Sequence, residues 1–334
     1  MSPNYIPKVS VIVPVYNTEL YVERAIISLM EQTLDDVQFI IIDDGSKDNS
    51  LSIIKQVITR YPARQGQVTL ISRENRGVAA TRAQGMELAT GDYVIHLDSD
   101  DWAELNWLEL LYSKATSENA DIVVCNYYEV HESKIVKVAM PPSNHGFECA
   151  KELLCDKLRG YTWNKLISRN VINYIDTPFV DGINYLEDFI YVMKCFSIAT
   201  YVSYHEGYLY NYNQQNINSL TKGMSDAKIA DIINTVNYVS DICDSMDNLY
   251  PLTKELISFK IKQKTFLIYG EWESVNKNTW QIFPETRFYT WFSNVPIHFK
   301  LCMILADFKL YFLASVIMRC SVKIKHLFLS FVRF

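Results

Sequence analysis

The segment GDYVIHLDSDDW, Gly91 to Trp102, decides the fold of this chain. Its apolar run VIHL opens shortly after a glycine, a pattern typical of a buried strand. Three carboxylates follow directly, those of Asp98, Asp100 and Asp101. Carboxylates this close repel one another unless a cation or a set of hydrogen-bond donors lies among them. The segment therefore predicts a strand that ends in a site for a metal and for the anion that the metal holds.

Three upstream segments have the same form, an apolar strand with a polar end. They are Lys8–Asn17 (KVSVIVPVYN), Asp36–Ser46 (DVQFIIIDDGS) and Val68–Asn75 (VTLISREN). Apolar residues at helical spacing lie between them, as in 20–30 and 78–89. This alternation predicts an α/β fold, a Rossmann-like, mostly parallel sheet with helices on both faces. Ligands bind such sheets at the carboxyl ends of the strands, so we expect the site there.

The turn after the first strand, PVYNTEL (residues 14–20), excludes several classes of α/β protein. It contains no glycine, whereas a dinucleotide-binding domain needs a glycine-rich turn at this point, and a P-loop is also missing. A sugar-phosphate nucleotidyltransferase would carry a glycine-rich basic loop here, and an aspartate phosphatase would place its acidic pair here. What remains is a fold that binds a nucleotide without a glycine cradle.

Composition sets further bounds on the function. The chain has 334 residues and a formal charge of −6, which argues against a nucleic-acid partner. Its seven cysteines include no C-x-x-C pair, so we expect reduced thiols and no zinc site. The start MSPNYIPK lacks the charged and apolar regions of a signal peptide. We therefore expect a cytoplasmic protein.

Taken in order and spacing, three segments resemble one known family. VSVIVPVYN, IIIDDGSKDNS and ENRGVAATRAQGMELATGDYVIHLDSDDW are similar to the nucleotide-sugar domain of the inverting family 2 glycosyltransferases, which have the GT-A fold. The resemblance is strong over residues 8 to about 130 and weaker afterwards. It implies an enzyme that moves a sugar from a nucleotide-diphosphate sugar, in the first instance a UDP-sugar, with the help of Mn²⁺ or Mg²⁺.

The acceptor that the resemblance implies is a hydroxyl of a glycan or of a lipid-linked acceptor in bacterial surface-polysaccharide synthesis. The alternative is a non-catalytic binding or scaffolding subunit that keeps the fold. This alternative is disfavoured because every acidic position expected for the metal and the base is occupied. UDP release from UDP-sugars in the presence of Mn²⁺ would discriminate the two.

The resemblance also implies roles for individual donor-side residues. Those that line the nucleobase pocket are Pro14, Val15 and Tyr16. Asp44 is expected to accept a hydrogen bond from the base, with Asp43 as its substitute. Those that border the donor after the third strand are Asn75, Gly77 and Arg82. The D-x-D element is Asp98, Ser99 and Asp100, in which Asp98 faces the ribose or sugar and Asp100 ligates the metal, with Asp98 and Asp101 as further metal ligands.

The catalytic base is expected in LEDFIY, residues 186–191, at the start of a predicted helix that ends at Ile198. A carboxylate in a first helical turn is stabilised as the anion by the helix dipole. Family members commonly carry a Glu-Asp pair here, which implies Asp188 as the base and Glu187 as its orienting partner or an acceptor contact. The alternative is a pair that only caps the helix.

The acceptor side is expected to follow a strand over 120–130. Trp163 and Lys165 resemble a recurrent W-x-K-L element near the acceptor entrance. A tryptophan face suits a sugar ring and a lysine suits a phosphate, although Trp163 may equally fill the core. Residues 208–221 resemble a stretch that closes over the diphosphate, which makes Ser219 a candidate contact.

The sequence predicts three parts: a GT-A domain over 1–221, with its nucleotide-sugar half up to about 130 and its acceptor half over 131–221; a helical appendage over 222–296; and a basic tail over 297–334. The tail contains six Lys or Arg against one acid, Asp307. We expect it to form an amphipathic helix on the anionic inner face of the cell membrane. The alternative is a helix packed in the core or in a homodimer.

Overall fold

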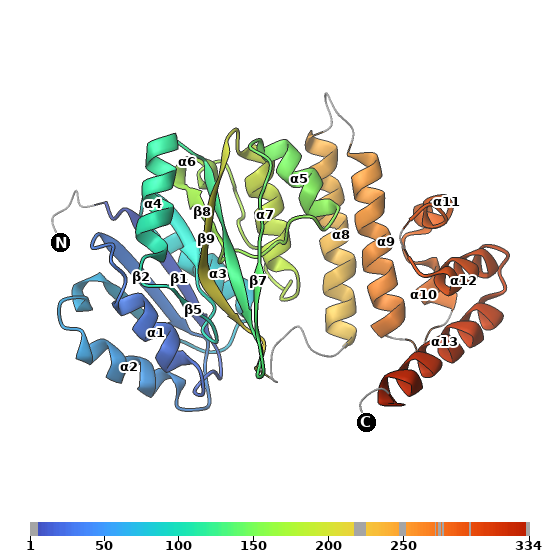
Figure 1. The fold of residues 1–334 in the computed structure, drawn as a ribbon, viewed down its shortest axis with the longest axis horizontal. Coiled ribbons are helices and arrows are strands. Elements are labelled where there is room, and N and C mark those ends of the chain that lie inside the picture. The colour runs from blue at the N-terminus through green and yellow to red at the C-terminus, as the bar shows by residue number, and fades with distance from the viewer. Residues whose placement is uncertain are drawn as a thin grey trace. The chain divides into compact units, whose positions relative to one another are not determined.

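A computed structural model describes residues 6–216, 225–246, 252–270, 272, 275, 277–293 and 295–331 (Figure 1). The chain divides into two compact units, residues 1–220 and 221–334. The first unit contains the sheet, and in the second the described residues form helices.

The first half of the sheet is parallel, as the sequence predicts. Its strands pair in the order β3-β2-β1-β4 and are β1 (Val9–Val15), β2 (Val37–Asp43), β3 (Val68–Ser72) and β4 (Tyr93–His96). The crossover helices are α1 (Val22–Met30), α2 (Ser50–Arg60) and α3 (Val78–Leu88), and a short 3₁₀ turn, η1 (Gln65–Gln67), leads into β3. Right-handed crossovers place α1 and α2 on one face of the sheet, whereas α3, which returns from β3 to β4, covers the other.

Beyond β4 the sheet becomes mixed, so the prediction of a mostly parallel sheet applies to its first half. The order continues β4-β8-β6-β9-β5, with β6 and β9 parallel, the other pairs antiparallel, and β7 paired to β6. The strands are β5 (Trp102–Ala103), β6 (Ile122–Val130), β7 (Ile135–Val138), β8 (Lys165–Ser168) and β9 (Val202–Asn213). The helices of this half are α4 (Trp107–Glu118), α5 (Gly146–Leu154), α6 (Arg169–Ile172) and α7 (Glu187–Ile198).

The central strands are apolar on both faces because helices cover both. In β1 and β2 only Pro14 and Gln38 are more than slightly exposed. Each buried valine or isoleucine of this kind contributes roughly 1.5 to 3 kcal/mol relative to an exposed one. The strands thus form a rigid base, and the parallel pairing brings their carboxyl ends to one edge.

The second unit is helical, which confirms the predicted C-terminal region. Its helices are α8 (Asp226–Met246), α9 (Thr253–Gly270), α10 (Lys277–Gln281), α11 (Arg287–Thr290), α12 (Ile297–Asp307) and α13 (Tyr311–Phe331), with a 3₁₀ turn η2 (Pro284–Thr286) (Figure 1). The residues predicted to form one amphipathic tail helix therefore form two. Both contribute to a core around Trp280, as Phe299, Met303, Ala314 and Met318 show. Within the described part of the chain, no helix is long and apolar enough to cross a membrane.

One buried side chain of β4 stands out energetically. His96 is 1 % exposed, and neither ring nitrogen has a hydrogen-bond partner. Its imidazole packs edge-on against the rings of Phe179 and Tyr191, with centroids 5.5 and 5.9 Å away. Burial, together with the charge of Arg82, holds the pKa of His96 well below its usual range. The ring is therefore neutral and carries two polar atoms without compensation, which is costly in a protein interior.

We expect His96→Phe to raise the free energy of unfolding by about 1 to 3 kcal/mol, because a phenyl ring fills the same aromatic site without unpaired polar atoms. Urea unfolding monitored by circular dichroism measures this change. His145→Phe, at an exposed position, serves as the control and should change the stability by no more than about 0.5 kcal/mol. A destabilised His96→Phe protein would contradict the interpretation.

Candidate active site

The carboxyl ends of the parallel strands carry most of the polar residues predicted from the sequence. Main-chain hydrogen bonds connect these ends: the Asp44 nitrogen donates to the Val15 oxygen at 2.8 Å, and the Arg73 nitrogen donates to the Asp43 oxygen at 3.1 Å. At the end of β1, Tyr16 is 46 % exposed. Its ring is therefore accessible for stacking, whereas Val15 is buried and only supports it.

Asp43 and Asp44 are buried and bonded within the protein. Asp43 accepts hydrogen bonds from the Ser46 nitrogen and the Ser72 hydroxyl. Asp44 accepts from the backbone nitrogens of Arg76 and Gly77, both at 2.9 Å, and forms an ion pair with Arg73 at 2.6 Å. Asp44 thus holds the loop over 73–77, which includes the exposed Asn75, against the end of β2. Asp44 Oδ1 accepts from Arg76 and contacts Arg73, whereas Oδ2 accepts from Gly77, so the predicted hydrogen bond from the base would fall to Oδ2.

Gly77 allows a close contact between the donor-side loop and the chain that precedes α7. It has a φ of +89°, and an added Cβ would collide with the side chain of Asn184. The Asn184 carbonyl accepts a hydrogen bond from the Ala79 nitrogen at 3.3 Å, which satisfies one free N–H at the start of α3. The N-terminal end of α3 is thereby fixed at the edge where an anion is expected.

Arg82 is the central charge of the site. It lies on α3, is 5 % exposed, and forms ion pairs with Asp98 at 2.7 Å and with Glu187. One buried guanidinium thus joins the first carboxylate of the D-x-D element to the Glu-Asp pair at the start of α7. The sequence predicted Arg82 as a donor-side residue but gave no sign of this bridge over 105 positions.

The three clustered aspartates point to different partners. Asp98 meets Arg82, and its backbone nitrogen donates to the Tyr210 hydroxyl at 3.1 Å. Asp100 accepts a hydrogen bond from the Asn216 side chain at 2.8 Å, and burial followed by the charge of Asp98 raises its pKa. Ser99 between them is buried and accepts a hydrogen bond from the Thr18 hydroxyl.

Asp101 was predicted as a further metal ligand, but both of its carboxylate oxygens accept hydrogen bonds from the protein. Its two carboxylate oxygens accept from the Tyr210 hydroxyl at 2.9 Å and from the Asn213 nitrogen at 2.7 Å. It is 1 % exposed and therefore ties β9 to the acidic segment. Among the described residues, no group of three or more His, Cys, Asp or Glu side chains is arranged to hold a metal. The metal role predicted for Asp98 and Asp100 stays a prediction.

Glu187 and Asp188 begin α7, as the sequence predicted for this helix. Leu186 before them has a left-handed φ of 66°, which turns the chain sharply into the helix. Glu187 is buried against Arg82, whereas Asp188 is partly exposed. Burial raises the pKa of Asp188, with the Arg82 charge acting in the opposite direction. A carboxylate whose pKa is raised accepts a proton more readily, as a general base must.

The packing gives Lys165 a role other than the predicted phosphate contact, and of the two alternatives left open for Trp163 it favours the core. Lys165 is fully buried, and its Nζ donates to the carbonyls of Arg159 and Tyr161 and to the Asn164 side chain at 2.7 to 2.8 Å. It therefore fixes the loop before β8 and does not meet a phosphate. Trp163 is 2 % exposed and fills the core, so its face is not available to a sugar. Ser219 lies outside the described residues.

The buried Lys165 should make the free energy of unfolding depend on pH. Burial lowers its pKa from 10.5 to about 7 in the folded protein. The unfolded chain therefore binds more protons between these two values, and stability should rise with pH by roughly 1 kcal/mol per unit over that window. Urea unfolding of the wild-type protein at pH 7, 8 and 9 measures the slope, and Lys165→Met should reduce it by this amount. Equal slopes in the two proteins would contradict the lowered pKa.

Sequence reasoning missed several residues of the site. Tyr210, Asn213 and Asn216 from the β9 region hold the acidic cluster, and Asn184 caps α3. A signal for the first of these was present, because YLYNYN, residues 208–213, places tyrosines at every second position, as in a strand with one aromatic face. The contact of Asn184 had no local signal.

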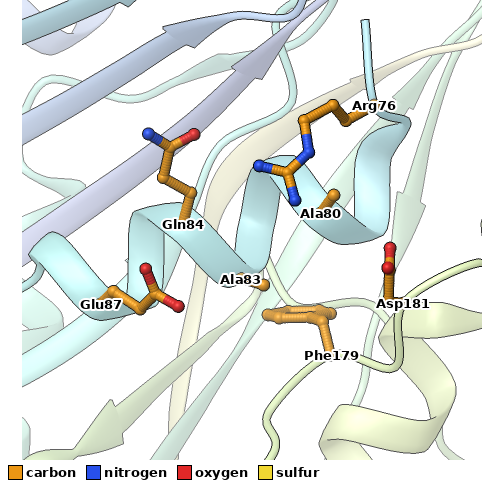
Figure 2. A pocket seen from close by; sticks show the side chains of 7 residues that line it. All are labelled: Arg76, Ala80, Ala83, Gln84, Glu87, Phe179 and Asp181. Carbon is orange, nitrogen blue, oxygen red and sulfur yellow. The ribbon is translucent and has the colours of Figure 1, made fainter.

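A separate open hollow of about 280 Å³ lies along α3 (Figure 2). The residues that line it are Arg76, Ala80, Ala83, Gln84, Glu87, Phe179 and Asp181. Figure 2 shows Arg76 and Asp181 at one end and Glu87 at the other. The lining positions of α3 recur at helical spacing on the face opposite Arg82. The helix therefore separates this hollow from the candidate site.

The parallel nucleotide-binding half, the acidic segment at its edge and the mixed extension that carries a second carboxylate pair define a glycosyltransferase of the GT-A fold. A family model described as glycosyl transferase family 2 matches residues 10–174. The putative glycosyltransferase EpsH of Bacillus subtilis (strain 168) is 30 % identical over 278 residues, which cover 80 % of this chain and 78 % of EpsH. The chain belongs to glycosyltransferase family 2, and it is an enzyme that transfers glycosyl groups.

Two further comparisons agree. The cholesterol galactosyltransferase of Borreliella burgdorferi is 34 % identical over 234 residues, 65 % of this chain and 63 % of that protein. The crystal structure of S. aureus TarS 1-349 in complex with UDP-GlcNAc has a TM-score of 0.72 and 16 % identity, with 95 % of this chain and 92 % of that chain covered. The second similarity confirms the fold.

Proposed function

We propose that this enzyme is an inverting glycosyltransferase that moves a sugar from a UDP-sugar to an acceptor hydroxyl, with Asp188 as the general base. The observation that carries the proposal is the bridge from Asp98 through Arg82 to Glu187. This bridge connects Asp98, on the donor side, to Glu187, which directly precedes the proposed base Asp188. A buried arginine between two acids costs desolvation energy, and that cost is explained if the bridge sets the distance between two reacting groups.

Asp188 suits the role of base by its environment. It is partly exposed beside the buried Glu187, so an acceptor hydroxyl has access to it. Glu187 is held by Arg82 and positions the first turn of α7. The acceptor hydroxyl donates its proton to Asp188 as its oxygen attacks the anomeric carbon on the face opposite the leaving diphosphate, which inverts that carbon.

Asp98 and Asp100 are the residues that would hold a divalent metal. They fit such an ion because burial and then the charge of Asp98 raise the pKa of Asp100, and a cation would relieve the repulsion between the two carboxylates. Mg²⁺ and Mn²⁺ prefer oxygen ligands and are commonly bound by one or two carboxylates together with substrate phosphates. The bound ion supplies charge neutralisation of the departing diphosphate. Asp101 supports the site by holding Tyr210 and Asn213.

The donor is assigned to the edge formed by β1 and β2. Tyr16 offers an exposed ring for the uracil, and Asp44 holds the loop that carries Asn75 and Gly77. Binding of UDP-GlcNAc by TarS, a protein of the same fold, supports a UDP-sugar. For the acceptor we propose a glycan or lipid-linked hydroxyl in bacterial surface-polysaccharide synthesis, and the galactosyltransferase relative, which is named for cholesterol, is consistent with a lipid-borne acceptor.

Two variants distinguish the proposed role of Asp188 as the base from the proposed role of Asp100 as a metal ligand. Asp188→Asn should lower kcat for sugar transfer by about 10² to 10⁴-fold, because the proton acceptor is lost, while UDP binding in the presence of Mn²⁺ is retained. Asp100→Asn should instead weaken the Mn²⁺-dependent part of UDP binding. Calorimetry with UDP and an assay of UDP release from UDP-sugars measure the two effects.

Asp181→Asn, an exposed acid on the far side of α3, is the matched control and should leave both quantities unchanged. Full transfer activity in Asp188→Asn would refute the assigned base. UDP binding that does not respond to Mn²⁺ in the wild-type protein would refute the metal site.

We also propose that α11, α12 and α13 bind an anionic membrane surface. The two longer helices bury one face and expose the other. On α12 the buried positions 299, 302, 303 and 306 alternate with exposed Ile297, Leu301, Ile304 and Phe308 at helical spacing. Among the described side chains of α13 the most exposed apolar one is Phe312, at 83 %, and on α11 it is Phe288, at 84 %.

The charges around this apolar surface favour lipid over a second copy of the chain. Lys300, Lys309 and Lys323 accompany the exposed apolar residues, and the one acid of α12, Asp307, forms an ion pair with Arg287 at 2.9 Å. Basic charge beside exposed aromatic rings matches an anionic headgroup region, in which each cation contributes about 1 kcal/mol. Two identical basic surfaces would repel each other in a homodimer.

Co-sedimentation with phosphatidylcholine vesicles that contain phosphatidylglycerol tests this surface. We expect the double variant Phe308→Ser/Phe312→Ser to bind at least about tenfold more weakly than wild type, because two exposed rings no longer enter the bilayer. Ile135→Ser, an exposed apolar residue of the first unit, is the control. The membrane assignment would be overturned if the double variant bound vesicles as tightly as wild type. It would also be overturned if sedimentation velocity showed that the wild-type protein is a dimer and that the double variant is a monomer.

A further inference from the structure

Three aromatic rings form a continuous stack beside the acidic cluster. Trp163 lies parallel to Tyr210, with ring centroids 4.3 Å apart and an interplanar angle of 7°. Tyr161 lies on Trp163, with centroids 4.7 Å apart and an angle of 14°. Because the Tyr210 hydroxyl donates a hydrogen bond to Asp101, the stack is attached to the segment that carries Asp98 and Asp100.

The stack is buried at one end and partly exposed at the other. Tyr210 and Trp163 are 0 % and 2 % exposed, whereas Tyr161 and the neighbouring Tyr212 are partly exposed. The rings of Tyr161 and Tyr212 lie 5.6 Å apart at an angle of 53°. A pair of amphipathic rings at the end of a packed stack presents a preformed surface with little conformational entropy to lose.

This pair lies next to the proposed base. Gly160 packs directly on the backbone of Phe189, the residue after Asp188, and an added Cβ would lie 2.9 Å from the Phe189 Cα. Lys165 Nζ donates to the Tyr161 carbonyl at 2.8 Å and so fixes this segment. Burial, opposed by the charge of Arg159 and reinforced by that of Asp188, raises the pKa of Tyr161 to about 12. Tyr161 therefore stays protonated and uncharged beside the site.

The order of the strands places these rings away from the donor. The nucleobase edge is formed by β1 and β2, and the D-x-D element follows the adjacent β4. Tyr212 lies on β9 and Tyr161 shortly precedes β8, both on the other side of β4 in the sheet. A sugar ring at Tyr161 and Tyr212 would therefore lie across β4 from the edge proposed for the nucleobase.

We propose that Tyr161 and Tyr212 form the platform on which a pyranose ring of the glycan acceptor stacks. This inference rests on the proposed function and names the subsite that orients the acceptor hydroxyl toward Asp188. It replaces Trp163, which the sequence suggested for this role, with the exposed end of the stack that Trp163 supports. The apolar face of the sugar lies on the rings, and its hydroxyl groups remain free for polar partners.

Saturation-transfer NMR tests the platform, with methyl β-D-glucopyranoside and methyl β-D-galactopyranoside as separate probes and UDP and Mn²⁺ present. In the wild-type protein we expect saturation of the axial ring protons and an upfield shift of their signals. Tyr161→Ala should weaken binding of the responding glycoside roughly tenfold, and Tyr212→Leu should also weaken it. Tyr161→Phe keeps the ring and should bind as wild type does. Tyr174→Ala, which removes a tyrosine that is 78 % exposed elsewhere in the first unit, is the matched control.

UDP calorimetry and a thermal unfolding curve for each variant separate the possible failures. If the wild-type protein binds UDP but neither glycoside contacts it, or if the folded Tyr161→Ala and Tyr212→Leu variants bind the glycosides as wild type does, the platform is refuted while the proposed donor site stands. If the wild-type protein does not bind UDP, the proposed function itself fails, and the platform with it.

Discussion

A buried positive charge organises this glycosyltransferase. Arg82 lies on α3 and pairs with Asp98, which follows β4, and with Glu187 of α7. Removal of one acid from such a group leaves an uncompensated charge in the interior, which costs several kcal/mol. The three elements must therefore keep their relative positions for the fold to be stable. In the proposed mechanism the same arrangement holds the donor-side carboxylate Asp98 at a fixed position relative to Asp188, the proposed base.

The second half of the sheet is attached to the first through side chains as well as through backbone pairing. Asp101 accepts hydrogen bonds from Tyr210 and Asn213, and Asn213 donates in turn to the Asp100 carbonyl at 3.1 Å. The carboxylates of the acidic segment thus have different partners. Asp98 pairs with Arg82 and Asp100 accepts from Asn216, whereas Asp101 binds β9. Repulsion among neighbouring acids is reduced because they use different donors.

The parallel half could be predicted from the sequence because its signals are local. Four apolar runs with polar ends predict four strands, and apolar residues recur at helical spacing in the segments between them. The mixed half depends on pairings between distant segments, such as β6 with β9, for which a single sequence carries no direct signal. The same limit explains Lys165, whose role depends on carbonyls of a loop. It also explains Asp101, because residue type alone does not show which donors a carboxylate will meet.

The contact between Asn184 and the start of α3 links the loop proposed to border the donor to the segment that leads to the proposed base. Asn184 accepts a hydrogen bond from Ala79 beside Gly77, and it precedes Asp188 by only four residues. In the proposed mechanism a nucleotide that contacts the Gly77 loop would therefore act on the same short piece of backbone that orients Asp188. Donor binding and the orientation of the proposed base would then be coupled, which would disfavour attack by water before the acceptor is bound.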